Sequence, residues 1–242
     1  MEVHAHTHTA RKKWTHYFWE FIMLFLAVFC GFLAEYRLEH KIEQERGKEY
    51  IHSFYDDLLK NLVTCSVIID DSKKKMDILN NMEPCYDSVL KNWRAASCLA
   101  GLLKNSRGLA IAQFSDGTME QLKNAGGLRL LDKEDRDSII SYDATIRSYK
   151  STESAVLQQS LDNVKNDFKK LVNFKANRFL DSASYATEIP FLFSGNEELL
   201  NELFNDLVRY KRAITFQSNQ MIQLKEKTNH LVAYFTAKYH FD

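Results

Sequence analysis

An uncharged, strongly apolar run near the N-terminus is the feature that most constrains how this chain can fold. Residues 21–34 read FIMLFLAVFCGFLA, fourteen residues without a charged side chain. A helix needs roughly 20 apolar residues to cross a bilayer, and amphipathic aromatic residues extend the run to about that length. We therefore expect residues 17–36 to form one membrane-spanning helix about 30 Å long. The aromatic residues, at positions suited to lipid headgroups, are Trp14, Tyr17, Phe18, Trp19 and Tyr36.

A cleaved signal peptide is the competing interpretation, because such peptides also combine a basic start with an apolar run of this length. No small-x-small cleavage site follows the run, and Phe29 before Cys30 is too bulky for a lipoprotein signal. We therefore expect that the segment is not cleaved and that it anchors the chain in a lipid bilayer.

Basic residues flank the span on both sides, three at residues 11–13 and four among residues 37–48. These counts alone do not decide the orientation. The charges before the span are adjacent and unpaired, whereas those after it are interleaved with glutamates. This difference favours residues 1–16 as a basic, histidine-containing cytoplasmic tail and residues 37–242 as an extramembrane domain on the far side of the membrane.

The predicted span has two different faces when its residues are placed at 100° intervals. One face carries six aromatic residues between Phe18 and Tyr36. The other carries Ala27 and Gly31, whose small-xxx-small spacing lets helices approach closely. We expect this face to pack against another transmembrane helix, from a second copy or from a partner protein. The residues of this packing face are Glu20, Ala27, Gly31 and Ala34.

Glu20 lies on the packing face, about one turn inside the basic flank. A carboxylate there is costly unless it reaches the interface or meets a partner. Two interpretations stay open, namely a side chain that extends to the headgroups and a buried or proton-linked role.

The rest of the chain has the composition of long helices. Only 8 Gly and 2 Pro occur, about a third of average usage, and sheets with tight turns would need more of both. Lys plus Arg and Asp plus Glu are equal at 32 each, so no basic field is available to hold nucleic acid. We expect no nucleic-acid partner.

Apolar residues recur at three- and four-residue steps in the segments that follow the span. Alternating charges in residues 35–50 predict that the membrane helix continues into a solvated stalk. The spacing then predicts a helix over 51–79, ended by Glu83-Pro84, and further helices over 86–104, 132–179 and 196–238. Between the second and third, Ser115 or Asp116 is expected to cap a short helix that runs through Asn124 and is ended by Gly126-Gly127.

These segments predict an all-α fold, with one N-terminal transmembrane helix continuing into an elongated antiparallel bundle of about four long helices. The last segment has heptad-like spacing. Its expected buried seam includes Leu203, Leu207, Ile214, Leu224 and Leu231.

The chain contains the stretch HAHTHTARKKWTHYFWEFIMLFLAVFCGFLAEYRLEHKIE and, within roughly residues 114–142, the stretches TMEQLKNAGGLRLL and DSIISYD. These stretches resemble an uncharacterised family of single-span membrane proteins found in Bacteroidota. The resemblance implies a bacterial inner membrane, a single pass, and a helical C-terminal domain, which our orientation places in the periplasm. It implies no activity and no catalytic residue.

No motif in the sequence indicates an enzyme, a cofactor or a metal. His4, His6, His8 and His16 are too sparse to define a closed metal site, and the Glu49-x-x-His52 spacing lacks the second motif of a di-iron bundle. Gly126 and Gly127 followed by Arg129 form a possible anion or ligand site, because a backbone nest with a cation can hold a carboxylate or phosphate. A helix stop with a surface arginine is the alternative.

The cysteines show no zinc-type spacing. Cys30 lies in the apolar run, and Cys65 falls within a predicted helix. Cys85 precedes the helix predicted over 86–104 and Cys98 falls within that range, and the two can pair in an oxidising compartment or stay reduced in a cytosolic domain. The sequence leaves both states open.

Three functions fit these features. The leading expectation is a non-catalytic, membrane-anchored scaffold or accessory subunit of a membrane protein complex. The second is a sensor-like bundle that responds to a ligand or to strain near residues 106–131 and works through a partner. The third is an ion-linked membrane subunit that uses Glu20.

Overall fold

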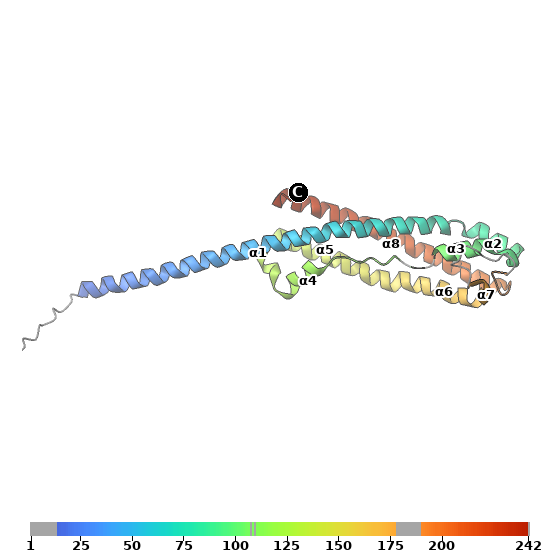
Figure 1. Ribbon diagram of the computed structural model, residues 1–242, viewed down its shortest axis with the longest axis horizontal. Coiled ribbons are helices and arrows are strands. Elements are labelled where there is room, and N and C mark those ends of the chain that lie inside the picture. The colour runs from blue at the N-terminus through green and yellow to red at the C-terminus, as the bar shows by residue number, and fades with distance from the viewer. Residues whose placement is uncertain (1–13, 107, 109, 178–189, 242) are drawn as a thin grey trace, which may run out of the picture. The chain divides into compact units, whose positions relative to one another are not determined.

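The computed structural model describes residues 14–106, 108, 110–177 and 190–241 (Figure 1). Within these ranges every named element is helical, and the only β pairing is one antiparallel bridge between Val172 and Leu192. The expected all-α fold class is therefore confirmed, together with a long apolar helix near the N-terminus.

Helix α1 spans Trp14–Leu79. Both prolines of the chain, Pro84 and Pro190, lie outside it, so no residue in α1 lacks the backbone N–H that the helix requires. The molecule divides into two units between Glu49 and Tyr50. The first unit contains the apolar run and the predicted stalk, and α1 is the one helix of the described residues long and apolar enough to cross a membrane.

The second unit contains the remainder of α1 and the ten helical elements that follow it in the described chain. These are α2 (Met82–Lys91), η1 (Trp93–Ala95), α3 (Ser97–Ser106), α4 (Gly117–Asn124), η2 (Gly127–Leu130), α5 (Lys133–Thr152), the π-helix η3 (Glu153–Gln158), α6 (Gln159–Leu171), α7 (Phe174–Asn177) and α8 (Glu197–Tyr239).

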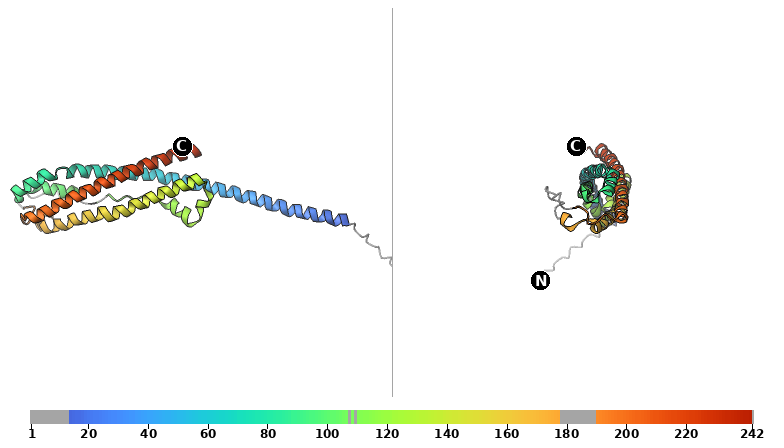
Figure 2. Two further views of the ribbon diagram at one scale, coloured as in Figure 1. Left: turned by 180° about the vertical axis from the view of Figure 1, so that it is seen from behind. Right: turned by 90° about the vertical axis from the view of Figure 1, so that its right-hand side faces the viewer.

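Helix α8 runs alongside the α5–η3–α6 run and alongside the part of α1 after residue 50 (Figures 1 and 2). Lys238 contacts Asp135 near the start of α5, and Glu202 contacts Lys170 near the end of α6. Tyr55 of α1 shares a 3.1 Å hydrogen bond with Thr236 of α8. These three long helical runs form the frame of the second unit.

The helix predicted over 86–104 is wrong as a single element. Asn92 has φ −151° and ψ 86°, which ends α2, and the short η1 separates it from α3. Helix α1 ends at Leu79, the predicted end, but Glu83-Pro84 is wrong as the stop signal, because Pro84 lies in the first turn of α2. Proline is accepted there because first-turn N–H groups have no acceptor within the helix.

Residues 110–116 form no helix or strand and run as an extended segment beside α1 (Figure 1). The Asn61 side chain donates to the Ser115 carbonyl at 3.2 Å and accepts from the Ser115 N–H at 2.8 Å. Thr64 Oγ1 donates to the Gln113 carbonyl at 3.2 Å. Ala112 and Phe114 are buried. Side chains of α1 thus supply the backbone hydrogen bonds that this segment lacks within itself.

The short helix predicted before Asn124 is confirmed as α4, but its capping differs from the prediction. Asp116 occupies the N-cap position without a side-chain cap, because its carboxylate pairs with Lys150 at 2.8 Å. Asp57 of α1 serves the helix start instead, accepting from Ser115 Oγ at 2.6 Å and from the Thr118 N–H at 3.3 Å. Burial by itself raises the pKa of Asp57, but these hydrogen bonds outweigh it and lower the pKa.

The helical run predicted over 132–179 ends at Leu171, because Val172 is extended and forms the bridge to Leu192. Residue 179 lies outside the described residues. Helix α8 matches the predicted 196–238 closely, and the Asn196 side chain accepts from two N–H groups of its first turn. Of the predicted seam, Leu203, Leu207, Ile214 and Leu224 are buried, whereas Leu231 is only half-buried.

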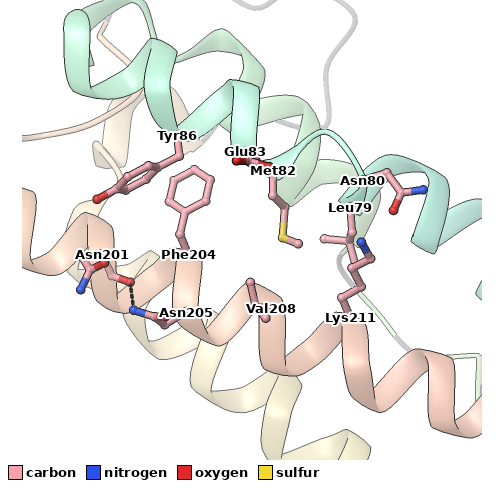
Figure 3. A pocket seen from close by; sticks show the side chains of 10 residues that line it. All are labelled: Leu79, Asn80, Met82, Glu83, Tyr86, Asn201, Phe204, Asn205, Val208 and Lys211. Carbon is pink, nitrogen blue, oxygen red and sulfur yellow. Dashed lines mark hydrogen bonds between the residues drawn. The ribbon is translucent and has the colours of Figure 1, made fainter.

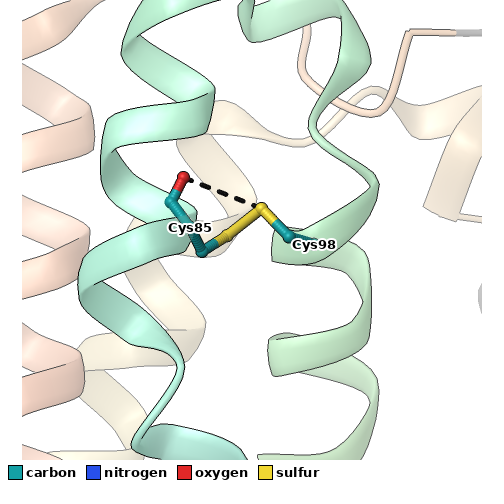
Figure 4. Close-up of a disulfide and its surroundings, with 2 residues drawn as sticks. All are labelled: Cys85 and Cys98. Atoms are coloured by element: carbon teal, nitrogen blue, oxygen red, sulfur yellow. Dashed lines mark hydrogen bonds between the residues drawn. A yellow bond between two sulfur atoms is a disulfide. The ribbon is translucent and has the colours of Figure 1, made fainter.

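Cys85 of α2 and Cys98 of α3 form a disulfide (Figure 4). Their Cα atoms are 5.7 Å apart, within the usual range for this bond. The bond joins the two helices on either side of η1. Of the other cysteines, Cys30 is exposed and Cys65 is buried.

Candidate functional site

The predicted packing face of the first unit is open in the structure. Ala27, Gly31 and Ala34 are exposed, and a Cβ atom built on Gly31 would meet nothing within 4 Å. The Phe25 ring stacks on Phe29 at 5.9 Å. The small residues therefore leave room for a second helix, and the association itself stays a prediction.

Glu20, the fourth residue of this face, has a partner on its own helix. Its Oε1 lies 3.1 Å from Nε2 of His16, one turn earlier. His16 precedes the uncharged run, so the pair lies at the end of the predicted span. This geometry fits a carboxylate that reaches the interface.

Backbone conformation explains the glycine at position 126, and close packing explains the glycine at position 127. Gly126 has φ 66°, a left-handed conformation that favours glycine. A Cβ on Gly127 would lie 3.0 Å from the Leu122 side chain and 3.2 Å from Tyr50. Arg129 is exposed. A turn and close packing therefore account for both glycines without a ligand, and the anion site predicted there stays a prediction.

A slot of about 360 Å³ lies between the α1–α2 corner and α8 (Figure 3). Met82 and Leu79 reach toward Phe204 and Val208 across it, and the Tyr86 ring lies 5.0 Å from Phe204 edge to face. Its rim carries both charge signs. The rim residues are Asn80, Glu83, Asn201, Asn205 and Lys211.

A second and larger hollow, of about 600 Å³, lies between α5 and α8. We call it the polar groove. On α5 the lining side chains other than Tyr149 are small, whereas on α8 they are longer, so the hollow follows from this difference in size. The lining residues are Ser141, Ala144, Thr145, Ser148, Tyr149, Gln220, Gln223, Leu224 and Lys227.

Lys227 is the charged residue of the polar groove. Its Nζ donates to Thr145 Oγ1 at 2.7 Å, to the Ser141 carbonyl at 2.9 Å and to Ser141 Oγ at 3.0 Å. All three acceptors are neutral. Burial lowers the pKa of Lys227, since a desolvated ammonium without a carboxylate beside it loses stability relative to the neutral amine.

A buried polar network adjoins the polar groove at the π-helix η3. Tyr149 donates its hydroxyl to Glu153 at 2.8 Å, and Gln217 of α8 donates to both of them, at 2.9 and 2.8 Å. Burial raises the pKa of Tyr149, so the phenol stays protonated as a donor. Single π turns inside helices are frequent at functional sites, which adds weight to this part of the bundle.

Another buried network holds the end of α8 against the start of α5. Asp135, with no exposed side-chain surface, accepts from Tyr234 at 2.7 Å, from Lys238 at 2.8 Å and from Tyr239. Hydrogen bonds and charge from Asp135 outweigh the effect of burial and raise the pKa of Lys238. A buried carboxylate with a cation and two phenols is internally satisfied, so this network is structural.

Metal chemistry gains no support from the described residues, in which no three His, Cys, Asp or Glu side chains cluster to hold an ion. His52, from the Glu49-x-x-His52 spacing, lies 3.6 Å from Asp56 and packs edge to face on Phe241. His4, His6 and His8 lie outside the described residues.

No protein-family model, curated protein or solved structure matches the chain. Its function is therefore inferred from its own residues. The resemblance to a Bacteroidota family stays a prediction.

Proposed function

We propose that this chain is a non-catalytic, membrane-anchored accessory subunit: α1 crosses the bilayer once, and the helical second unit serves a membrane protein complex. The observation that carries the proposal is the exposure of the apolar run. Nine large apolar side chains of residues 21–34 are at least 45% exposed, including Phe21, Leu24 and Phe32, and Ile22 is partly exposed.

Such a surface needs a cover. Soluble monomers rarely expose contiguous apolar patches larger than a few hundred Å², and a helix that is apolar on all sides belongs in a protein core or a membrane. The second unit has its own buried cores, which contain Leu58, Leu79, Ile139 and Leu207 among others. Lipid is the cover that fits a single helix with aromatic residues at both ends.

The disulfide supports the proposed orientation. Structural disulfides persist in oxidising compartments such as the bacterial periplasm. The bond between Cys85 and Cys98 is in the second unit, which agrees with a periplasmic bundle and a cytoplasmic N-terminus.

A partner in the membrane is supported by the open packing face. Helices in lipid gain by close backbone approach, and Gly31 has no neighbour that would hinder it. The ion-linked alternative gains less support, because Glu20 already contacts His16 near the end of the span.

Protease accessibility tests the anchor and its orientation together. Protease added to spheroplasts should digest the second unit while the membrane fraction retains the apolar run. If the second unit is protected until the membrane is permeabilised, the proposed orientation is wrong. If the intact chain is recovered in the soluble fraction, the chain has no membrane anchor. Purification in mild detergent should then yield stoichiometric protein partners, and a chain that purifies alone as a monomer would contradict the role of a subunit.

A further inference from the structure

The polar groove combines one uncompensated positive charge with a set of hydrogen-bond donors. The residues that line it include Lys227 but no carboxylate. The contacts of Lys227 Nζ within the described chain are to three neutral oxygens. An ammonium in this setting is positioned and partly desolvated, and its charge is left without a counter-ion inside the groove.

The hydrogen bonds around Lys227 determine which protons point outward. Thr145 donates its hydroxyl proton to the Ser141 carbonyl at 2.9 Å, so Thr145 only accepts from the lysine. Ser141 Oγ also accepts from Lys227, and its own proton remains to be donated. A hydroxyl that accepts from a cation becomes a better donor, because hydrogen bonds in a chain polarise one another.

Other residues that line the polar groove add hydrogen-bond donors on both α5 and α8. Gln220, Gln223 and Lys227 are spaced by three and four residues, so they share one face of α8. Ser141 and Ser148 are two turns apart on α5 and face the same hollow. Amide and hydroxyl groups therefore line both walls of the space of about 600 Å³ that Lys227 also lines, and this volume is within the range of small-molecule pockets.

We propose that the polar groove is a binding site for a small oxyanion ligand, a molecule with a carboxylate or phosphate group placed against Lys227 and Ser141. The ligand oxygens accept from Ser141, Ser148 and the glutamine amides, while Lys227 supplies the charge. An oxyanion is favoured over a neutral polar molecule because it balances the ammonium that the groove leaves uncompensated. The site is separate from the membrane anchor and does not depend on the proposed function.

The slot beside Phe204 is a weaker candidate for the same ligand. Its rim holds Glu83 as well as Lys211, and its floor is apolar. A carboxylate on the rim repels an oxyanion, so the two hollows differ in the ligand that they select.

Calorimetric titration of the full chain in neutral detergent micelles tests the proposal, with citrate and inorganic phosphate as separate probes at constant ionic strength. We expect saturable binding of at least one probe, weakened about tenfold or more by Lys227→Gln. Lys225→Gln removes the same charge two residues away, outside the groove lining, and should bind like the wild type. The probe that binds distinguishes a phosphoryl ligand from a carboxylate ligand.

A second variant guards against loss of folding in Lys227→Gln. Ser148 is exposed and lines the groove, so Ser148→Leu fills the hollow without disturbing a buried contact. It should abolish binding while the circular dichroism spectrum and unfolding midpoint stay unchanged. The proposal is overturned if neither probe binds below about 10 mM, or if the Lys227→Gln, Ser148→Leu and Lys225→Gln variants all bind like the wild type.

Discussion

Two parts of helix α1 are both rich in apolar residues, yet they have opposite surroundings. In residues 21–34 the apolar side chains cover the whole circumference and are exposed in the first unit. In residues 51–79 they recur at three- and four-residue steps, and Leu58, Cys65 and Leu79 are fully buried. The distribution of apolar residues around the helix, more than their number, thus distinguishes the run that we propose lies in lipid from the part that packs against protein.

The polar residues between the apolar ones extend this comparison. In the bundle part of α1, Asp57 and Asn61 are buried and bind the extended segment and the start of α4. The apolar run has no counterpart to them, since it contains no charged or amide side chain. A helix that packs against protein can specify its neighbours by polar contacts, whereas one in lipid relies on shape.

A carboxylate placed in each part gives the largest expected effects. Leu58→Asp buries an unpaired charge in the core, and we expect it to cost more than about 4 kcal/mol and to prevent stable folding of the bundle. Leu26→Asp, at the middle of the span, should leave the bundle folded but oppose insertion by about 2.5 to 3.5 kcal/mol. Membrane fractionation and circular dichroism separate the two outcomes. If both variants affect bundle folding equally, the two parts of α1 do not differ in their surroundings.

Truncation of the α8 seam extends the comparison to a second helix. Leu203→Ala and Leu207→Ala each remove a fully buried side chain, and each should lower the free energy of unfolding by about 2 to 5 kcal/mol. Leu231→Ala should cost less, about 1 kcal/mol, because Leu231 is only half-buried. Urea unfolding measures all three. Losses below about 0.5 kcal/mol at Leu203 and Leu207 would mean that the seam is not packed in the bundle.

Removal of the disulfide should affect only the second unit. The Cys85→Ala and Cys98→Ala double variant opens a loop with a sequence separation of 13 residues, and loops of this size contribute about 3 kcal/mol when closed. We expect a lower unfolding midpoint and unchanged membrane association. Thiol labelling of the wild type under denaturing conditions, before and after reduction, checks that the bond is present. Labelling of all four cysteines before reduction would contradict it.

The sequence predicted the helical class, α4 and α8 because these depend on local signals. The seam of α8 repeats over many turns, and Asn196 begins it with a capping side chain. The break at Asn92 was missed, since the conformation there depends on the packing of α2 and α3 and on their disulfide rather than on a proline or glycine. The polar groove was missed for a similar reason.

The polar groove requires two helices that are about 80 residues apart in the chain, as the Lys227–Thr145 separation of 82 shows. One signal for it was present. Ser141, Ala144, Thr145 and Ser148 are small residues at helical spacing, and three of them carry a hydroxyl group. This pattern predicts a hollow once a facing helix is known. When the facing helix is not known, the same pattern indicates a helix face exposed to solvent.

The smallest expected effect on the bundle belongs to Gly31→Leu, which tests the packing face in the apolar run of α1. A leucine there keeps the run apolar and improves helix propensity, and the structure leaves space for its Cβ. The free energy of bundle unfolding should therefore stay the same, while complexes that use the packing face should dissociate because the backbones can no longer approach closely. Phe25→Leu, on the aromatic face, is the matched control and should leave complexes intact. Complex size in mild detergent and disulfide crosslinking through the exposed Cys30 report the association. If wild type and Gly31→Leu give the same complexes and crosslinks, shape on this face does not select a partner, and the span acts as a tether whose only cover is lipid.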